Sequence, residues 1–245
     1  MDFNKKKPLH IFAFLLLILT FIIIIGLPVL SFIGVFPSTQ DTVITEISFQ
    51  MEIMIFIFQL VIIFFTLVLI PILWYIIVNE CSMKEVFSRL KLKLEGIDTA
   101  FLWGIVAAIL IFISFIAIEL ILISLGVSPE ELGNIEDLEV YFSPVTLFLI
   151  VAIQPIAEEI FFRGFLLEKI QSFAGNNIAI FSTAILFGLA HGSYQSQYPV
   201  IFPMIMGIFL GYIVIKTKNL YSAITTHVLF NIGAFILYYF AKALV

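Results

Sequence analysis

The stretch LHIFAFLLLILTFIIIIGLPVLSFIGVF, Leu9–Phe36, contains no Asp, Glu, Lys or Arg. A helix needs about 20 consecutive apolar residues to cross the hydrocarbon core of a bilayer, and this stretch is longer than that. It also exceeds the roughly 7–15 apolar residues of a cleavable signal peptide, although Lys5–Lys7 precede it. The stretch therefore predicts an uncleaved membrane-spanning helix.

The rest of the chain has the same character, with 62% hydrophobic and 12% charged residues, a composition typical of a polytopic membrane protein. Three further uncharged windows each predict one span: Ile53–Val78, Thr99–Ile118 and Asn219–Ala241. Ser143–Ser172 supplies another span, and the uncharged Ile170–Ile215 is long enough for two, divided at Gly192–Pro199. The sequence predicts an all-α bundle of about seven transmembrane helices.

Basic residues occupy alternate connections of this bundle: Lys5–Lys7, Lys84–Lys93, Arg163–Lys169 and Lys216–Lys218. The opposite connections, Ser38–Glu46 and Ser128–Glu139, contain acidic residues and no basic ones. Because basic loops stay in the cytoplasm, we expect a cytoplasmic N-terminus and an external C-terminus. The second basic connection, Met83–Gly96, places Val86, Leu90 and Leu94 at helical spacing, which indicates either an amphipathic segment at the headgroups or an ordinary basic loop.

We divide the chain into residues 1–142, with three spans, and residues 143–245, with four. The second part carries strongly polar side chains within its predicted spans: Glu158, Glu159, Arg163, His191, His227 and Asn231. A single such group is explained by helix packing or by snorkelling to the interface. Two adjacent carboxylates exceed what packing requires, and intramembrane ionisable groups are costly, so the set predicts a functional polar cavity.

Helical spacing separates the two glutamates. Glu159 and Arg163 are related as i and i+4 and are expected to form an ion pair, whereas Glu158 points about 100° away. Pro155 removes a backbone hydrogen bond and is expected to kink the helix beside the pair. One glutamate is thus neutralised and its neighbour is left free.

The histidines belong to two later helices. Phe187 and His191 share one helix face, and His227 and Asn231 share another, again by i, i+4 spacing. At about 1.5 Å per residue, Glu158 and His191 each lie roughly 20–25 Å from the turn between their helices, and the other pair lies roughly 14–20 Å from its own turn. Groups from three helices are expected to meet at one level.

A partly desolvated carboxylate beside a histidine is a candidate general base, with a pKa expected to rise on burial. It would deprotonate a water that attacks a peptide carbonyl, while a second histidine and an amide stabilise the oxyanion. Zinc is the alternative, since two His and one Glu form a known ligand set, although the chain has no H-E-x-x-H. Ser193 lacks the G-x-S-x-G setting of a nucleophile.

Three motifs occur in order: E-E-x-x-x-R at Glu158–Arg163, F-x-x-x-H at Phe187–His191 and H-x-x-x-N at His227–Asn231. They resemble the signature of the CAAX prenyl protease and bacteriocin-processing (CPBP, or abortive-infection) family of intramembrane glutamic endopeptidases. The resemblance implies a helix bundle with a cavity open toward the cytoplasm. It also implies that the protein cleaves a membrane-associated peptide or protein, with or without a prenyl group.

The resemblance also implies residue roles. Glu158 and His191 would activate the water, Glu159 with Arg163 would support them, and the H-x-x-x-N motif would form the oxyanion site. No cofactor and no nucleic-acid partner are expected. Three alternatives stay open: a zinc-dependent protease, a non-catalytic bacteriocin-immunity or scaffold protein, and a transporter with a protonatable glutamate, although no inverted repeat is seen.

Overall fold

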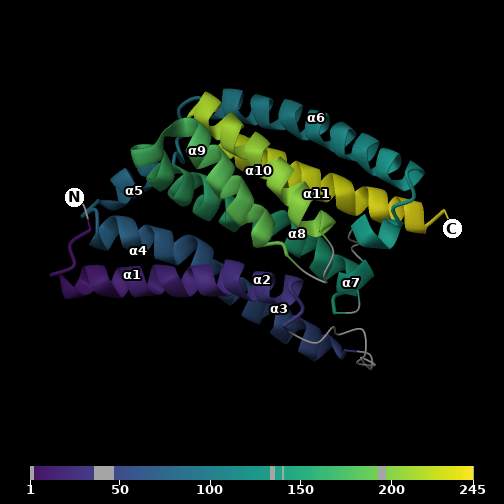
Figure 1. Ribbon diagram of the computed structural model, residues 1–245, viewed down its shortest axis with the longest axis horizontal. Coiled ribbons are helices and arrows are strands. Elements are labelled where there is room, and N and C mark those ends of the chain that lie inside the picture. Colours follow the sequence, from purple (N-terminus) through teal and green to yellow (C-terminus); the bar gives the residue numbers. More distant parts are fainter. Residues whose placement is uncertain (1–2, 36–46, 133–135, 140, 193–196, 245) are drawn as a thin grey trace.

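The computed structural model describes residues 3–35, 47–132, 136–139, 141–192 and 197–244, in which every regular element is a helix (Figure 1). The α-helices are α1 (Pro8–Phe21), α2 (Leu27–Phe32), α3 (Phe49–Ile63), α4 (Ile70–Ile77), α5 (Met83–Arg89), α6 (Ile97–Ser124), α7 (Glu136–Glu139), α8 (Pro144–Glu159), α9 (Leu167–Leu189), α10 (Tyr198–Thr217) and α11 (Tyr221–Lys242). The π-helical segments Ile22–Gly26, Phe64–Leu69 and Ile160–Leu166 join α1 to α2, α3 to α4 and α8 to α9, and Pro129–Leu132 forms a 3-10 turn.

Among the described residues, six stretches are long and apolar enough to cross a membrane: Pro8–Phe32, Phe49–Ile77, Ile97–Ser124, Pro144–Leu189, Tyr198–Thr217 and Tyr221–Lys242. The fourth has 46 residues, which at about 1.5 Å per residue is roughly twice the thickness of the hydrocarbon core. Gly175, with φ 83° and ψ 175°, breaks it into two helices, a conformation that its missing Cβ allows. The stretch therefore makes two passes. The all-α bundle of about seven membrane helices is confirmed, and the protein is a multi-pass integral membrane protein.

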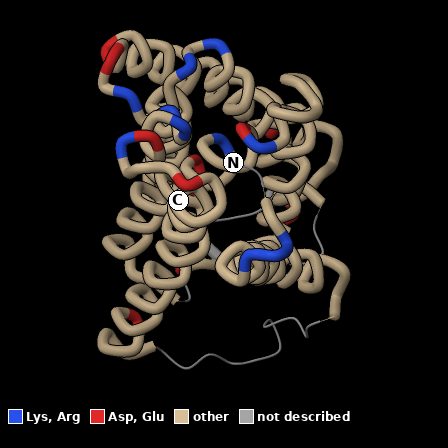
Figure 2. The backbone as a smooth tube through the Cα atoms, turned by 90° about the vertical axis from the view of Figure 1, so that its left-hand side faces the viewer, with Lys and Arg blue, Asp and Glu red and all other residues tan. Residues whose placement is uncertain are grey.

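The two termini lie at opposite ends of the bundle, as an odd number of passes requires (Figure 1). We call the end formed by the N-terminus, α5 and the α10–α11 turn the basic end, and the end formed by α7 and the C-terminus the acidic end. Figure 2 faces the basic end, where Lys and Arg occupy turns and helix termini. The acidic connection Ser38–Glu46 lies outside the described residues, and the orientation in a membrane stays a prediction.

The basic connection contains a short helix, as its periodicity predicts. The Glu85 carboxylate accepts a hydrogen bond from the Ser82 backbone N–H, 2.7 Å, which satisfies a free donor at the start of α5. Val86 and Leu90 are buried in the core, but α5 ends at Arg89 and Leu94 lies beyond it, 77% exposed. The predicted amphipathic helix is therefore shorter than Met83–Gly96.

Buried polar contacts fix α8, the helix that carries the glutamates. Glu52 of α3 accepts hydrogen bonds from the Ser143 backbone N–H, 2.7 Å, and the Ser143 hydroxyl, 2.6 Å. A carboxylate at this position also complements the positive end of the α8 dipole. On its other side α8 packs against α11. These contacts place the end of α8 between the N-terminal helices and the last helix.

Candidate active site

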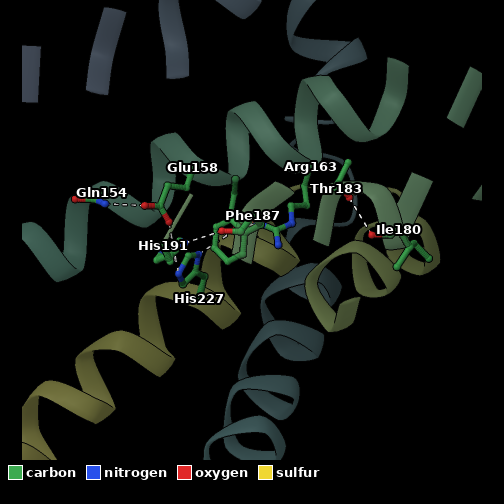
Figure 3. A network of polar contacts seen from close by, with 9 residues as sticks. Gln154, Glu158, Arg163, Ile180, Thr183, Phe187, His191 and His227 are labelled. Atoms are coloured by element: carbon green, nitrogen blue, oxygen red, sulfur yellow. Dashed lines mark hydrogen bonds and ion pairs between the residues drawn. The ribbon is translucent and has the colours of Figure 1, made fainter. Parts of the chain in front are cut away.

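The polar side chains singled out in the sequence come from four segments. α8 ends with the two glutamates, the following π-helical segment carries the arginine, and α11 carries His227 and Asn231. His191 lies in the turn just after α9, whereas the sequence analysis placed it within a helix. Figure 3 shows Glu158, His191 and His227 directed toward one another. The structure thus brings residues from the three motifs together.

Glu159 is fully buried and accepts two hydrogen bonds on one carboxylate oxygen. Its Oε1 lies 2.8 Å from Arg163 Nη1 and 2.9 Å from His227 Nδ1. The first contact is the predicted i, i+4 ion pair and is confirmed. The sequence analysis did not predict the second contact, between Glu159 and His227. Because a carboxylate only accepts hydrogen bonds, His227 carries its proton on Nδ1, and its Nε2 is the nitrogen that faces Glu158 Oε2, at 3.8 Å.

Arg163 is fully buried beneath two aromatic rings. Its guanidinium carbon lies 4.1 Å from the centroid of Phe187 and 5.7 Å from that of Phe162. Such contacts stabilise a cation that has lost its water. Arg163 belongs to the π-helical segment that begins shortly after Pro155, and π turns occur frequently at functional sites. The cation that neutralises Glu159 is therefore locked in place.

Glu158 has a different set of neighbours. Its Oε1 accepts a hydrogen bond from Gln154 Nε2, 2.7 Å, and Gln154 Oε1 accepts one from Gln59 Nε2 of α3, 3.1 Å. The sequence analysis missed both glutamines. Gln154 precedes Glu158 by i, i+4, so the spacing used for the other pairs would have found it. Nothing in the local sequence pointed to Gln59, because its contact depends on how α3 packs on α8.

His191 is oriented by the backbone of the preceding helical turn. Its Nδ1 lies 2.8 Å from the Phe187 carbonyl oxygen, which can only accept, so Nδ1 carries the proton and Nε2 is free to accept. The Phe187 ring contacts the rings of His191 and His227 edge-on, with centroids 4.6 and 5.6 Å apart. Phe187 therefore holds both histidines as well as Arg163, which gives a physical reason for the F-x-x-x-H spacing.

A cavity of about 300 Å³ opens beside Glu158. Its wall includes His191, Asn231, Gln154 and Gln59, together with Leu138 and Phe142 from the connection before α8. That connection belongs to the acidic end, which the charge pattern assigns to the outside. The cytoplasmic opening that the resemblance implied and the cytoplasmic N-terminus that the charge pattern implied both stay predictions. Ser193, the weak serine candidate, lies outside the described residues.

The free acceptors of the site suit proton transfer. Arg163 and His227 Nδ1 are paired with Glu159, and His191 Nδ1 is paired with the Phe187 carbonyl. The Glu158 carboxylate and the Nε2 atoms of the two histidines therefore remain as acceptors. Within the described residues, no three His, Cys, Asp or Glu side chains form a group arranged to hold a metal ion. The arrangement can hold a water between a carboxylate and an imidazole, with an amide close by.

The comparisons with known proteins concern this same region. No curated protein and no solved structure matches the chain. A family model described as Type II CAAX prenyl endopeptidase Rce1-like matches residues 141–233, a range that contains both glutamates, both histidines and Asn231. The match supports a CAAX-type membrane protease at the level of the family. The match confirms the resemblance drawn from the three motifs: residues 141–233 are similar to the Rce1-like type II CAAX prenyl endopeptidases.

Proposed function

We propose that this protein is a metal-independent intramembrane endopeptidase in which Glu158 is the general base. The observation that carries the proposal is the unequal pairing of two adjacent glutamates. Glu159 is neutralised by Arg163 and accepts a hydrogen bond from His227, whereas Glu158 lies on the cavity with His191 and accepts a hydrogen bond from the Gln154 amide. We assign the chemistry to residues 143–245 and expect residues 1–142 to shape access for the substrate.

In the proposed reaction a water lies between Glu158 and Nε2 of His191. Glu158 takes a proton from this water as its oxygen attacks the carbonyl carbon of the scissile peptide bond. Asn231 donates a hydrogen bond from its amide to the oxyanion that forms. Glu158 then gives the proton to the departing amine, and the peptide bond breaks without a covalent enzyme intermediate.

His227 contributes through its pairing with Glu159. To donate a hydrogen bond from Nε2 to an oxyanion, its ring must carry protons on both nitrogens. A carboxylate hydrogen-bonded to Nδ1 orients an imidazole and stabilises its protonated form, as in the Ser-His-Asp triad. Glu159 is therefore proposed to act on the oxyanion site through His227, in addition to pairing with Arg163.

The substrate is proposed to be a membrane-associated peptide or protein. The cavity wall combines apolar Leu138, Phe142 and Ile150 with the polar groups of the site, which suits an apolar segment carrying one reactive amide. We propose that the segment enters from the acidic end, where Leu138 and Phe142 line the cavity. Whether the substrate carries a prenyl group is a separate question that the cleavage assay below answers.

The test compares the membrane peptides of cells that carry wild-type protein, Glu158→Gln or Glu119→Gln. Glu119 lies in α6 within another span and is the matched control. Peptides made by the enzyme should disappear with Glu158→Gln and persist with Glu119→Gln, and their sequences and masses identify the cut bond and any lipid. Identical peptide sets in all three strains would contradict the proposal and favour the non-catalytic alternative.

A second experiment separates the glutamate mechanism from the zinc alternative. Zinc held by His191, His227 and a glutamate would be removed by a strong chelator, whereas a water activated by Glu158 and His191 needs no ion. Purified protein should keep its activity after prolonged chelation and contain no stoichiometric zinc. Activity that is lost on chelation and restored by zinc alone would overturn the mechanism.

A further inference from the structure

A second pocket, of about 450 Å³, lies at the basic end and is separate from the candidate active site. It is formed between α5, the segment that follows α5, α9 and the end of α10. Its wall carries the charged residues Arg89, Lys91, Lys93, Glu168 and Lys218. Four of these side chains are cationic and one is anionic, so the pocket attracts anions.

The single carboxylate of this pocket is already engaged. Glu168 accepts hydrogen bonds from the Tyr75 hydroxyl, 3.0 Å, and from Arg89 Nη1, 3.2 Å, and lies 3.4 Å from Lys169 Nζ. Arg89 and Lys169 therefore already neutralise Glu168, without a contribution from Lys91, Lys93 or Lys218. The positive charge of those three lysines is left for another partner.

Among the described residues, Lys91 is the lysine of this pocket whose buried charged end lacks a partner. Its Nζ is buried and has no hydrogen-bond partner in the described part of the chain, and burial lowers the pKa of this amine. An ammonium group removed from water without a partner is costly, and a bound anion would offset that cost. The Lys91 side chain lines the pocket together with Lys93 and Lys218, so an anion placed there lies next to all three lysines.

The segment that presents Lys91 is held firmly. The Lys91 carbonyl accepts a hydrogen bond from the Leu220 backbone N–H, 2.9 Å, and the Asn219 amide donates to the Lys93 carbonyl, 3.0 Å. Lys91 itself adopts a positive φ of 59°, a conformation uncommon for a residue with a side chain. The lysines are therefore fixed to the start of α11 in the folded state, as in a preformed site.

The surroundings of the pocket suit a lipid. Phe87 and Leu94 flank the lysines in sequence and are 46% and 77% exposed. Apolar side chains beside basic ones, at the end of a membrane bundle, are typical of a segment at the level of the headgroups. A ligand at this depth would meet cations at its headgroup and apolar side chains at its acyl chains.

We propose that this pocket binds the phosphate of an anionic phospholipid headgroup, with Lys91, Lys93 and Lys218 as its cationic contacts. Basic pockets between membrane helices on the cytoplasmic side are recognised sites for such headgroups. The site lies apart from Glu158 and does not depend on the proposed protease activity. A free phosphate has the same chemistry at its oxygens, and the experiment distinguishes the two sources.

The experiment measures lipid binding to the full-length protein by native mass spectrometry and by thermal unfolding in mixed micelles. Phosphatidylglycerol, phosphatidylcholine and inorganic phosphate are added in separate arms. Phosphatidylglycerol should bind and raise the melting temperature, whereas the zwitterionic lipid and inorganic phosphate should have little effect. Equal effects of both lipids would overturn the proposal, and an effect of inorganic phosphate alone would identify a free-anion site instead.

Variants locate the site. Lys91→Gln should weaken phosphatidylglycerol binding about tenfold or more, the value of one charge-assisted hydrogen bond. Lys84→Gln removes the same charge from exposed α5 outside the pocket and should change nothing. Should Lys91→Gln fold poorly, the double variant Lys93→Gln/Lys218→Gln, at residues on the pocket rim, gives the same test. Unchanged binding in the folded pocket variants contradicts the proposal.

Discussion

Glu159 and His227 are joined by a 2.9 Å hydrogen bond between Oε1 and Nδ1, on the same oxygen that accepts from Arg163. This oxygen therefore connects the end of α8, the π-helical segment after it and α11. Both glutamates belong to the polar cluster, but only Glu158 lines the cavity. The two carboxylates are expected to respond differently to substitution.

Replacing Glu159 by Ala should mainly unfold the protein. The change leaves Arg163 uncompensated at 0% exposure and frees the His227 ring. Truncation of one member of a buried ion pair costs about 3–5 kcal/mol. Thermal unfolding in detergent should show this loss, and Arg163→Ala should resemble Glu159→Ala. A Glu159→Ala protein as stable as wild type would mean that the pair does not hold the bundle.

Replacing Glu158 by Gln should mainly stop catalysis. The amide keeps the shape of the side chain but cannot take a proton from water, so turnover should fall by roughly 10²–10⁴-fold or more. Unfolding should remain close to wild type, because Glu158 has no buried cation to leave unpaired. The measurement is turnover of an identified substrate beside the melting temperature. Full activity in this variant would show that Glu158 is not the base.

Gln154 is predicted to position Glu158. Gln154→Leu removes the 2.7 Å hydrogen bond to Glu158 and the link to Gln59 while keeping a side chain of similar size. We expect kcat to fall by about tenfold, the effect of one misoriented charge-assisted contact, with a smaller change in KM. Gln154→Glu, which cannot donate a hydrogen bond when ionised, should not restore kcat. If Gln154→Leu reduced only the amount of folded protein, the residue would be structural.

Two glycines of α10 allow a matched comparison of helix packing. A Cβ atom at Gly207 would lie 2.9 Å from Ala184 Cα and 3.2 Å from Arg163 Nη2, whereas at Gly211 the nearest atom, in Ile180, would be 3.4 Å away. Gly207→Ala should therefore lower both the amount of folded protein and its activity. Gly211→Ala should be well tolerated. Equal tolerance at both positions would contradict the close approach of α10 to α9.

Reporter fusions test the orientation. Because the basic connections should stay inside, fusions after Lys93 and Lys218 should report a cytoplasmic location, and a fusion after Leu244 an external one. The same result would place Leu138 and Phe142, which line the cavity, toward the external side. A cytoplasmic signal after Leu244 would instead reverse the bundle or change the number of passes.

The sequence predicted those features that depend on local spacing and solvent. Charge-free windows predicted the membrane helices, since the bilayer imposes length and hydropathy on each span separately. The pairing of Glu159 with Arg163 followed from i, i+4 geometry, which needs no knowledge of neighbouring helices. The membrane helices and the Glu159–Arg163 pair could both be predicted because each depends on a single continuous segment of the chain.

Contacts between helices were not predictable in the same way. The bond of His227 to Glu159 and the link from Gln59 to Gln154 depend on the rotation of each helix about its axis, and a single sequence does not determine this rotation. The end of α9 before His191 was missed because periodicity does not fix helix boundaries. The direction of the cavity was implied only by resemblance, and the acidic-end residues in its wall are a structural result.

The π-helical segment Ile160–Leu166 has a consequence for how this chain tolerates insertions and deletions. A π turn accommodates one residue more than the α turn it replaces, and each residue turns a helix by about 100°. Removing one residue between Glu159 and Arg163 would convert the π turn into an α turn, so the helix beyond it, including the half of α9 before Gly175, would keep its phase. Such a deletion would change the spacing of Glu159 and Arg163 from i, i+4 to i, i+3 and so alter their ion pair, even though every side chain of the motifs is still present in the sequence.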